Sequence, residues 1–367
     1  MSITIDDICT YAPKSGIKAG EATKDGQYMF FTSSEDESKR YTDYLYDGEG
    51  IIMGTGGNAT LHYYHGKYAV STDCIVLRPD DRIRCKYLYY FFLANMSILE
   101  AGFKGAGLKH TNKKYIGSIS IPKRPSIDVQ DRVIVVLDKV IGIIKSRKHE
   151  IDALDDLIKA RFVEMFGDPV RNEKKWQTKA LEDACKSIVD CPHSTPSYTS
   201  EDTGFMCIRT SIVKKNRIKW EDIEYIPEEE YIQRIQRKKP EKGDVVYTRE
   251  GAILGIAAVI DRDCNVALGQ RSMLLSPDRA FCTPEFISVA MNFDSFLDNA
   301  LKGMSGSASP HINVGDIKAF KMILPPITQQ EAFSTFVTQV DKSKIVVQKA
   351  LDEAQLLFDS LMQQYFG

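Results

Sequence analysis

Several short runs of this sequence have the residue types and spacing of enzyme active sites. The run Gly54-Thr-Gly-Gly-Asn-Ala59 matches the Gly-x-Gly-x-x-Ala pattern of dinucleotide-binding turns, and Gly102 and Gly107 have the spacing of a phosphate-binding loop. The residues after Ala59 do not begin a helix, and Leu108-Lys109 replaces the Lys-Ser/Thr pair that a phosphate-binding loop requires. We therefore expect ordinary turns at both places.

Two further patterns are typical of metal sites. Asp168 with Glu173-Lys174-Lys175 resembles the Asp…Glu-x-Lys pattern of nucleases, and His62 and His65 are three residues apart. The first pattern lies in the connection after a long predicted helix, and no third ligand accompanies the two histidines. The Asn-Pro-Pro-Tyr and Asp-Pro-Pro-Tyr signatures of amino-methyltransferases do not occur in the sequence. We expect no catalytic residue and no metal ligand in this chain.

The charge of the chain is balanced overall but uneven along its length. A net charge of −2 argues against a surface that is coated with nucleic acid everywhere. Residues 101–127 and 204–220 nevertheless contain basic residues and no acidic residue. One such cluster alone is best explained as a solvated surface, but two clusters in a repeated frame favour contact with phosphate groups.

Polar and basic side chains in these segments and in nearby loops are candidates for contact with duplex DNA. Basic side chains neutralise phosphates or pair with guanine, and short polar side chains on a rigid loop reach base edges. A capped turn explains the Pro-flanked residues 193–195 equally well, and a structural ion pair explains Arg249 or Arg271 at least as well. The candidates are Lys104, Lys109, His110, Thr111, Asn112 and Lys113 in the first half, and His193, Ser194, Thr195, Arg209, Thr210, Ser211, Lys214, Lys215, Arg249, Arg271, Ser305, Ser307, His311 and Asn313 in the second.

The elements that must position these loops alternate between mixed and helical segments. Residues 1–126 and 168–326 contain short β-type runs between turns, with a helical stretch near Lys86 to Leu99. Residues 127–167 and 327–367 repeat apolar side chains at intervals of three and four, which is typical of a long helix with a narrow apolar seam. Neither seam has a partner within its own segment, so we expect the two helices, each roughly 54 Å long, to pair as a stiff spacer.

The two halves of the sequence repeat each other. Both helical segments follow an aliphatic-Pro pair and end in Phe-Gly. Counting from Ile121-Pro122 and Leu324-Pro325 aligns Asp138-Lys139 with Asp341-Lys342, and in this register the helices differ by three residues before Phe-Gly. Matching segments in the mixed regions are 7–9 and 183–185, 26–32 and 204–210, 50–53 and 244–247, and 105–112 and 305–313. Strand positions match while loops diverge, which is expected of one scaffold that reads two different targets.

This arrangement resembles the specificity subunit of type I restriction–modification enzymes over nearly the whole chain. The resemblance is carried by Phe166-Gly-Asp-Pro169 with Asn172 and Trp176, by Val189-Asp-Cys-Pro-His-Ser-Thr-Pro196 leading to Ile208-Arg-Thr210, and by the Ile121-Pro122 and Leu324-Pro325-Pro326 exits. It implies an α+β fold in which two mixed α/β target recognition domains (residues 1–126 and 168–326) are separated by a pair of long antiparallel coiled-coil helices (127–167 and 327–367), with a pseudo-two-fold internal repeat.

The resemblance also implies a function. Each domain would read one half of a split, asymmetric site in double-stranded DNA, and the helices would set the gap and bind two methyltransferase subunits, which restriction subunits join. S-adenosylmethionine, and ATP and Mg²⁺ where a restriction subunit is present, would belong to those partners, with no cofactor in this chain. The first domain departs from the pattern, because it lacks a match to Lys175-Trp176 and to the Asp-Cys-Pro-His run. Two alternatives stay open: a specificity subunit of a type IIB-like cleavage–methylation enzyme, and a coiled-coil scaffold that binds protein.

Size and composition agree with a multidomain cytoplasmic protein. At 367 residues, with 43% hydrophobic and 27% charged residues, the chain predicts two or three ordinary domains. It contains no apolar run of about 18 residues, and its first residues lack the pattern of a signal peptide. The eight cysteines are scattered without a Cys-x-x-Cys pair, so we expect buried free thiols.

Overall fold

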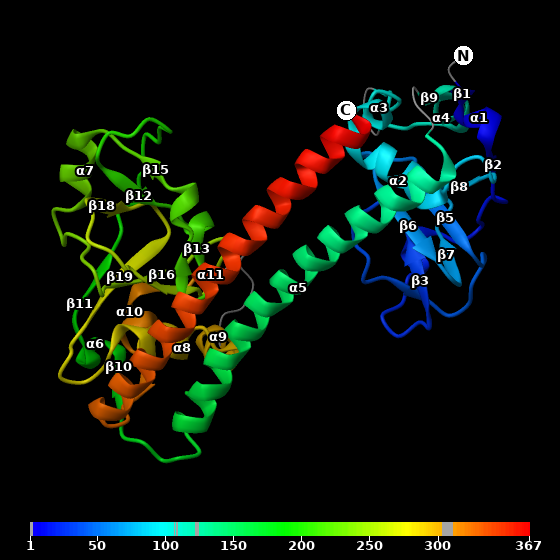
Figure 1. The fold of residues 1–367 in the computed structure, drawn as a ribbon. Coiled ribbons are helices and arrows are strands. Elements are labelled where there is room, and N and C mark those ends of the chain that lie inside the picture. Colours follow the sequence, from blue (N-terminus) through cyan, green and yellow to red (C-terminus); the bar gives the residue numbers. More distant parts are fainter. Residues whose placement is uncertain (1–2, 106, 108, 122–124, 303–310) are drawn as a thin grey trace. The chain divides into compact units, whose positions relative to one another are not determined.

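The computed structural model describes residues 3–105, 107, 109–121, 125–302 and 311–367 (Figure 1). The chain divides into two compact units. The first comprises residues 1–149 and 348–367, and the second comprises residues 150–347. Each unit therefore contains one mixed region together with parts of both long helices.

The first unit is built on a four-stranded antiparallel sheet in the order β2-β8-β5-β6. A three-stranded sheet in the order β4-β3-β7 contains the parallel pair β3 and β7, and β1 pairs with β9. The strands are β1 (Ile3–Thr4), β2 (Cys9–Tyr11), β3 (Tyr28–Phe31), β4 (Arg40–Tyr41), β5 (Glu49–Gly54), β6 (Leu61–His65), β7 (Tyr68–Val70), β8 (Cys74–Pro79) and β9 (Ser120–Ile121). The helices are α1 (Ile5–Ile8), η1 (Ala19–Glu21), α2 (Cys85–Ala94), α3 (Met96–Glu100) and α4 (Lys113–Ser118).

The second unit has the same topology with other strands, β11-β19-β16-β17 and β15-β12-β18, and β10 pairs with β20. These strands are β10 (Thr178–Ala180), β11 (Cys185–Asp190), β12 (Met206–Ile208), β15 (Glu224–Tyr225), β16 (Val245–Thr248), β17 (Ala257–Val259), β18 (Val266–Leu268), β19 (Ser272–Pro277) and β20 (Lys321–Ile323). Its counterpart helices are α6 (Leu181–Ala184), α8 (Pro284–Met291), α9 (Asp294–Leu301) and α10 (Val314–Lys318). The additions are the hairpin β13 (Val213–Lys214) and β14 (Arg217–Ile218), the 3-10 turns η2 (Thr210–Ile212) and η3 (Trp220–Asp222), and α7 (Glu228–Arg234). The predicted internal repeat is therefore confirmed.

Strand register confirms the sequence matches within this repeat. Ile51 of β5 pairs with Leu77, and Val245 of β16 pairs with Leu275, so residues 50–53 and 244–247 have the same place in the two large sheets. Residues 7–9 and 183–185 both lead from a four-residue helix into the first strand of the large sheet. Ile8, Ala184, Ile51 and Val245 are buried, which explains why apolar residues were retained at these positions.

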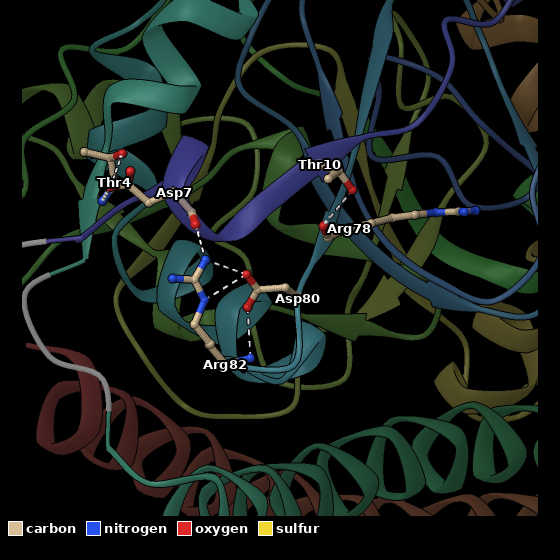
Figure 2. Close-up of polar contacts among 6 residues, drawn as sticks. All are labelled: Thr4, Asp7, Thr10, Arg78, Asp80 and Arg82. Carbon is tan, nitrogen blue, oxygen red and sulfur yellow. Dashed lines mark hydrogen bonds and ion pairs between the residues drawn. The ribbon is translucent and has the colours of Figure 1, made fainter.

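In the first unit, a polar corner fixes α1 beside the turn that follows β8 (Figure 2). The backbone N–H and the hydroxyl of Thr4 both donate to Asp7 Oδ2 at 2.8 Å, which forms a capping box. These hydrogen bonds hold the pKa of Asp7 below its ordinary value. Arg82 donates to the Asp7 carbonyl and to Asp80 Oδ2, and Thr10 donates to the Arg78 carbonyl on β8. The corner thus joins α1, β2 and β8 to one another, and the first loop of the domain begins after β2.

The two long helices, α5 (Ile127–Phe166) and α11 (Ile327–Phe366), both contain 40 residues. A fully buried glutamine occupies the same position near each N-terminus: Gln130 accepts from the Arg84 N–H at 2.8 Å, and Gln330 accepts from the Thr283 N–H at 3.1 Å. Both glutamines also donate to a proline carbonyl five residues earlier. This arrangement sets one common register that runs from Ile127 and Ile327 to the two Phe-Gly endings.

The predicted alignment of Asp138 with Asp341, and the unequal helix lengths inferred from it, are wrong. The chain from Pro122 to Ile127 is three residues longer than that from Pro325 to Ile327, so the difference lies before the helices. The contacts of the two carboxylates differ accordingly. Asp138 pairs with Lys86 at 2.7 Å, whereas Asp341 pairs with Lys344 at 3.3 Å.

The helices pair in antiparallel fashion within each unit. In the first unit, Val133 and Leu137 of α5 share a buried cluster with Met362 and Phe366 of α11. In the second unit, Phe162 near the end of α5 lies 5.5 Å, ring centroid to ring centroid, from Phe333 near the start of α11. Among the described residues, no helix has the length and apolar character that would let it cross a membrane.

Candidate nucleic-acid interface

Five loops of the second unit meet at one edge of its large sheet. β11 ends at Asp190 opposite Met273, and β16 ends at Thr248 opposite Ser272, so the ends of both strands lie beside the start of β19. The parallel strands β12 and β18 end at the same place, where the Gly269 N–H donates to the Ile208 carbonyl at 2.9 Å. The segment 311–313 joins them, because the Ile312 N–H donates to the Arg249 carbonyl at 2.9 Å.

A buried arginine lies at the centre of this edge. Arg249 is 5% exposed, and its guanidinium contacts Asp190 Oδ1 at 3.1 Å and Glu250 Oε1 at 2.8 Å. The other oxygen of Asp190 lies 3.0 Å from His193 Nε2. Of the alternatives that the sequence left open for Arg249, the structural ion pair is present, and through Asp190 it supports the loop that contains His193.

The residues 191–197, which we call the second edge loop, expose the predicted polar side chains. His193, Ser194 and Thr195 are all exposed, and Thr195 donates to Gln270 Oε1 at 3.4 Å. Arg271 is also exposed and adopts a left-handed backbone conformation with φ of 68°. Its side chain lies beside Gly251, where an added Cβ would stand 3.5 Å from Arg271 Nη1. The structure thus exposes all four of these predicted side chains at the same end of the sheet.

The basic cluster 204–220 is divided between two sets of partners. The guanidinium of Arg209 lies 5.0 Å from the centre of the Tyr198 ring and 2.5 Å from Glu224, beside the second edge loop. Lys215 instead contacts Asp294 at the start of α9 at 3.2 Å, and Lys214 donates to the carbonyl of Ser211 at 2.8 Å. Thr210 and Ser211 form a 3-10 turn between these places.

The first unit repeats the same edge in a simpler form. His110 forms an antiparallel β-bridge with Gly56, and His311 forms one with Glu250. The next residue also has a corresponding partner in both units, since the Thr111 N–H donates to the Thr55 carbonyl at 3.0 Å and the Ile312 N–H to the Arg249 carbonyl. The match between residues 105–112 and 305–313 is therefore confirmed for their last residues. Ser305 and Ser307 lie outside the described residues.

The other predicted residues of the first unit make local contacts, and those of Lys104, Lys109 and His110 are made by the backbone. Lys104 and His110 exchange two backbone hydrogen bonds of 3.0 Å, and Lys109 accepts one from Gly57 at 2.9 Å. Thr111 is buried, and Asn112 caps α4 by accepting from the Tyr115 N–H at 3.0 Å. Lys113 Nζ stacks over the Tyr11 ring at 4.8 Å, and Asn313, the counterpart of Asn112, donates to Asp316 at 3.0 Å.

Sequence reasoning missed the loop 12–17, which we call the first edge loop. It follows β2 as the second edge loop follows β11. At the end of the loop, the Ile17 carbonyl accepts a hydrogen bond of 2.7 Å from the Thr72 N–H. Lys14 is exposed on it. A proline followed by a polar residue and serine, directly after a strand, was the signal shared by Pro13-Lys14-Ser15 and Pro192-His193-Ser194.

Arg237 was also missed, although it lies in the basic run 233–242. The side chain of Arg237 is exposed and donates to the Asp190 carbonyl at 3.3 Å, at the base of the second edge loop. Its position adds a further cation to the surface around His193.

The residues of the enzyme-like patterns have structural partners. Asp168 accepts from the N–H groups of Val170 and Arg171 at 2.8 and 2.9 Å; burial raises the pKa of its carboxyl, but these hydrogen bonds outweigh that effect and hold it below its ordinary value. Lys174 donates to the Met165 carbonyl at 3.0 Å and so caps the end of α5, and Glu173 accepts from the Asp168 N–H at 2.9 Å just beyond the helix. Strand β6, and no helix, follows the glycine run 54–59.

Known proteins share this architecture. Residues 1–155 and 173–354 match the family described as Type I restriction modification DNA specificity domain. The specificity subunit of type I restriction enzyme MjaVIII from Methanocaldococcus jannaschii is 22% identical over 306 residues, which cover 79% of this chain and 72% of the relative. The EcoBI specificity subunit from Escherichia coli is 20% identical over 343 residues, covering 86% and 71%.

A solved structure shows the same fold. The crystal structure of the type I restriction–modification S subunit from M. genitalium superposes with a TM-score of 0.64 at 14% identity, covering 100% of this chain and 96% of that chain. The family match includes both mixed regions and most of both long helices, and it agrees with the duplicated topology. The chain therefore belongs to the type I restriction–modification DNA specificity family.

Proposed function

We propose that this chain is the DNA-reading specificity subunit of a type I restriction–modification system, and that its two mixed regions each read one half of a bipartite, asymmetric site in double-stranded DNA. One observation carries this proposal: the two units share strand order and register, while the loops at the corresponding sheet edges differ in residues and partners. A shared scaffold with different edges suits two different half-sites on one duplex.

We assign residues 1–126 and 168–326 to the two recognition domains and residues 127–167 and 327–367 to the spacer. A helix of 40 residues is stiff and measures roughly 60 Å at 1.5 Å per residue. Paired helices of this kind would fix the number of unread base pairs between the half-sites.

The residues that we assign to DNA contact are those of the two sheet edges. Exposed cations such as Arg271, Arg237 and Lys14 would neutralise phosphates, and polar side chains such as Thr195 and Gln270 would reach base edges. Among the predicted candidates, Lys214 and Lys215 have the weakest support for a place in this interface, because Lys215 pairs with Asp294 and Lys214 with the Ser211 carbonyl.

We assign methyl transfer and cleavage to partner subunits and none to this chain. Two methyltransferase subunits would bind along the helices, where Ile345, Val346 and Leu356 of α11 are each 70% exposed. S-adenosylmethionine would be held by those subunits, and ATP and Mg²⁺ by restriction subunits where these are present. This assembly would act in the cytoplasm. The relatives support this assignment rather than a type IIB-like enzyme or a protein-binding scaffold.

Methylome sequencing of the host with and without this gene tests the proposal. We expect one bipartite, asymmetric motif to lose its methylation when the gene is deleted and to regain it on complementation. An unchanged methylome would refute a role in site recognition. Binding to duplex DNA, measured with the methyltransferase partners at several salt concentrations, separates DNA reading from a protein-binding scaffold, because phosphate contacts weaken steeply with salt.

A further inference from the structure

Each edge loop is held by one buried side chain that comes from a corresponding segment of its own unit. In the second unit this residue is Arg234, the last residue of α7, and in the first unit it is Tyr46. Both residues lie in the connection between the outer strand of the small sheet (β15 or β4) and the next strand of the large sheet (β16 or β5). The two side chains thus have the same place in the repeat, although their chemistry differs.

Arg234 binds the second edge loop with one guanidinium nitrogen and strand β18 with another. The side chain is 2% exposed. Nη2 donates to the Ser194 carbonyl at 2.7 Å and to the Ser194 hydroxyl at 3.1 Å, and Nη1 donates to the Leu268 carbonyl at 3.3 Å at the end of β18. The exposed loop is therefore fixed to a buried strand through a charged group, and hydrogen bonds of this kind are strong.

Glu230 completes this arrangement. One carboxylate oxygen accepts from Arg234 Nε at 3.1 Å, and the other accepts from the Ser197 N–H at 2.9 Å. The Glu230–Arg234 pair thus contacts the loop at Ser194 and at Ser197, on either side of Thr195. The buried charge of Arg234 is compensated, so the pair has no need of a further ligand.

Tyr46 holds the first edge loop with a neutral hydrogen bond. Its hydroxyl donates to the Pro13 carbonyl near the start of the loop. Its backbone exchanges two hydrogen bonds of 3.0 Å with Tyr68 of β7, and the two rings lie 5.5 Å apart. As β7 is the counterpart of β18, both holding residues are anchored on the same strand of the repeat.

We propose that Arg234 and Tyr46 are positioning residues that each set how well one DNA half-site is discriminated, by holding the loop that presents the reading side chains of their own domain. This inference rests on the proposed function. Neither residue needs to touch DNA, because both are buried behind their loops. A loop held in one conformation loses less entropy on binding and keeps its donors in register with base edges.

Two conservative substitutions in the full chain, co-purified with its methyltransferase subunits, test the proposal. Tyr46→Phe removes only the hydroxyl that binds Pro13. Arg234→Lys keeps the charge, but a lysine ammonium does not span Ser194, Leu268 and Glu230 together. Tyr28→Phe and Arg262→Lys are the matched controls, since Tyr28 lies on β3 and Arg262 stacks on Trp220.

The probes are four duplexes built on the motif found in the wild-type methylome: the intact site, each half-site scrambled alone, and both scrambled. We expect Tyr46→Phe to reduce discrimination at one half-site roughly fivefold and Arg234→Lys to reduce it at the other roughly tenfold. Each variant should leave the opposite half-site and the doubly scrambled duplex within about twofold of wild type, as should the controls. Hydrogen exchange of peptide 191–198 should rise only in Arg234→Lys.

Two results for Tyr46→Phe would overturn the inference, even if Arg234→Lys failed to fold. The first is unchanged discrimination at both half-sites, and the second is an equal loss of affinity for all four duplexes. A wild-type complex that bound all four duplexes equally would instead refute the proposed function. The two failures are therefore distinguishable.

Discussion

The packing of α5 against the second unit predicts the cost of removing Phe162. The Phe162 side chain is fully buried, and its ring centroid lies 5.0 to 5.5 Å from those of four other phenylalanines: Phe166, Phe286, Phe293 and Phe333. The last of these belongs to α11, and Phe286 and Phe293 belong to the region of α8 and α9. One side chain therefore joins both long helices to the recognition domain.

Phe162→Ala leaves a large cavity in this aromatic cluster. Truncation of a buried phenylalanine costs about 3–5 kcal/mol, and lost ring pairs place this site toward the upper half of the range. For a unit of this size a loss of about 4 kcal/mol lowers Tm by roughly 10 °C. Val163→Ala is the matched control, because Val163 is 45% exposed on the next position of the same helix and should change stability by less than about 0.5 kcal/mol.

Calorimetry of the full chain measures the shift in Tm, and hydrogen exchange locates it. Exchange should rise in peptides of the second unit, such as those from α8, and stay unchanged in peptides of β5 and β8 in the first unit. A loss below about 1 kcal/mol, or equal deprotection of both units, would refute the reasoning that Phe162 stabilises this unit in particular.

Three further predictions concern the spacer, the sheet edge and the polar corner. Adding one turn to both α5 and α11 should lengthen the unread gap by about one to two base pairs without changing either half-site; methylome sequencing measures it, and an unchanged gap contradicts the spacer. Arg271→Ala should reduce the salt slope of DNA binding by about one and weaken cognate and random duplexes alike; loss at one base position alone would instead identify base reading. The pKa of Asp7 is lower in the folded protein, so its contribution to stability is complete above the ordinary carboxyl range and is lost as pH falls through the folded pKa. Thr4→Val should therefore reduce the loss of stability on acidification, as measured by urea unfolding between pH 6 and about pH 3; an identical pH dependence would exclude this role.

Periodicity and repetition made the scaffold predictable. The seams of α5 and α11 follow from apolar residues at intervals of three and four, and the end of α5 at Phe166 follows from Gly167, which has a φ of 80°. The strands were found because buried positions such as Ile51 and Val245 have to remain apolar in both copies. Where burial requires an apolar residue, the sequence therefore contained the information.

The register of the helices was mispredicted because it was taken from a short sequence match, whereas packing determines the register. Asp138-Lys139 and Asp341-Lys342 are common residue pairs, whereas the positions that determine register are the buried glutamines Gln130 and Gln330. A glutamine in an amphipathic segment has no obvious core role until its partners are known. Those partners, the backbone of Arg84 and of Thr283, lie more than 40 positions away in the chain.

The individual candidates could be proposed from the sequence, but their grouping and their connections could not. Residues 193–195 and Arg271 were separate candidates, and only the order of the strands in the structure brings them to one edge. The residue that holds them, Arg234, lies 40 positions from Ser194 and resembles any other residue of a basic run. Charge patterning alone does not distinguish a buried arginine from an exposed one such as Arg237, because the difference depends on tertiary packing.

The two sheet edges are built so that one can change without affecting the other. The first edge loop is held by Tyr46, Val76 and Thr72, and the second by Arg234, Glu230 and Asp190. Each set belongs to its own unit and satisfies its own buried polar groups, so substitutions in one set share no partner with the other and should act additively. The strands behind the loops have the same order in both units, and their buried positions tolerate little change. A duplicated scaffold with separately held edges therefore permits new half-site combinations at low cost in stability.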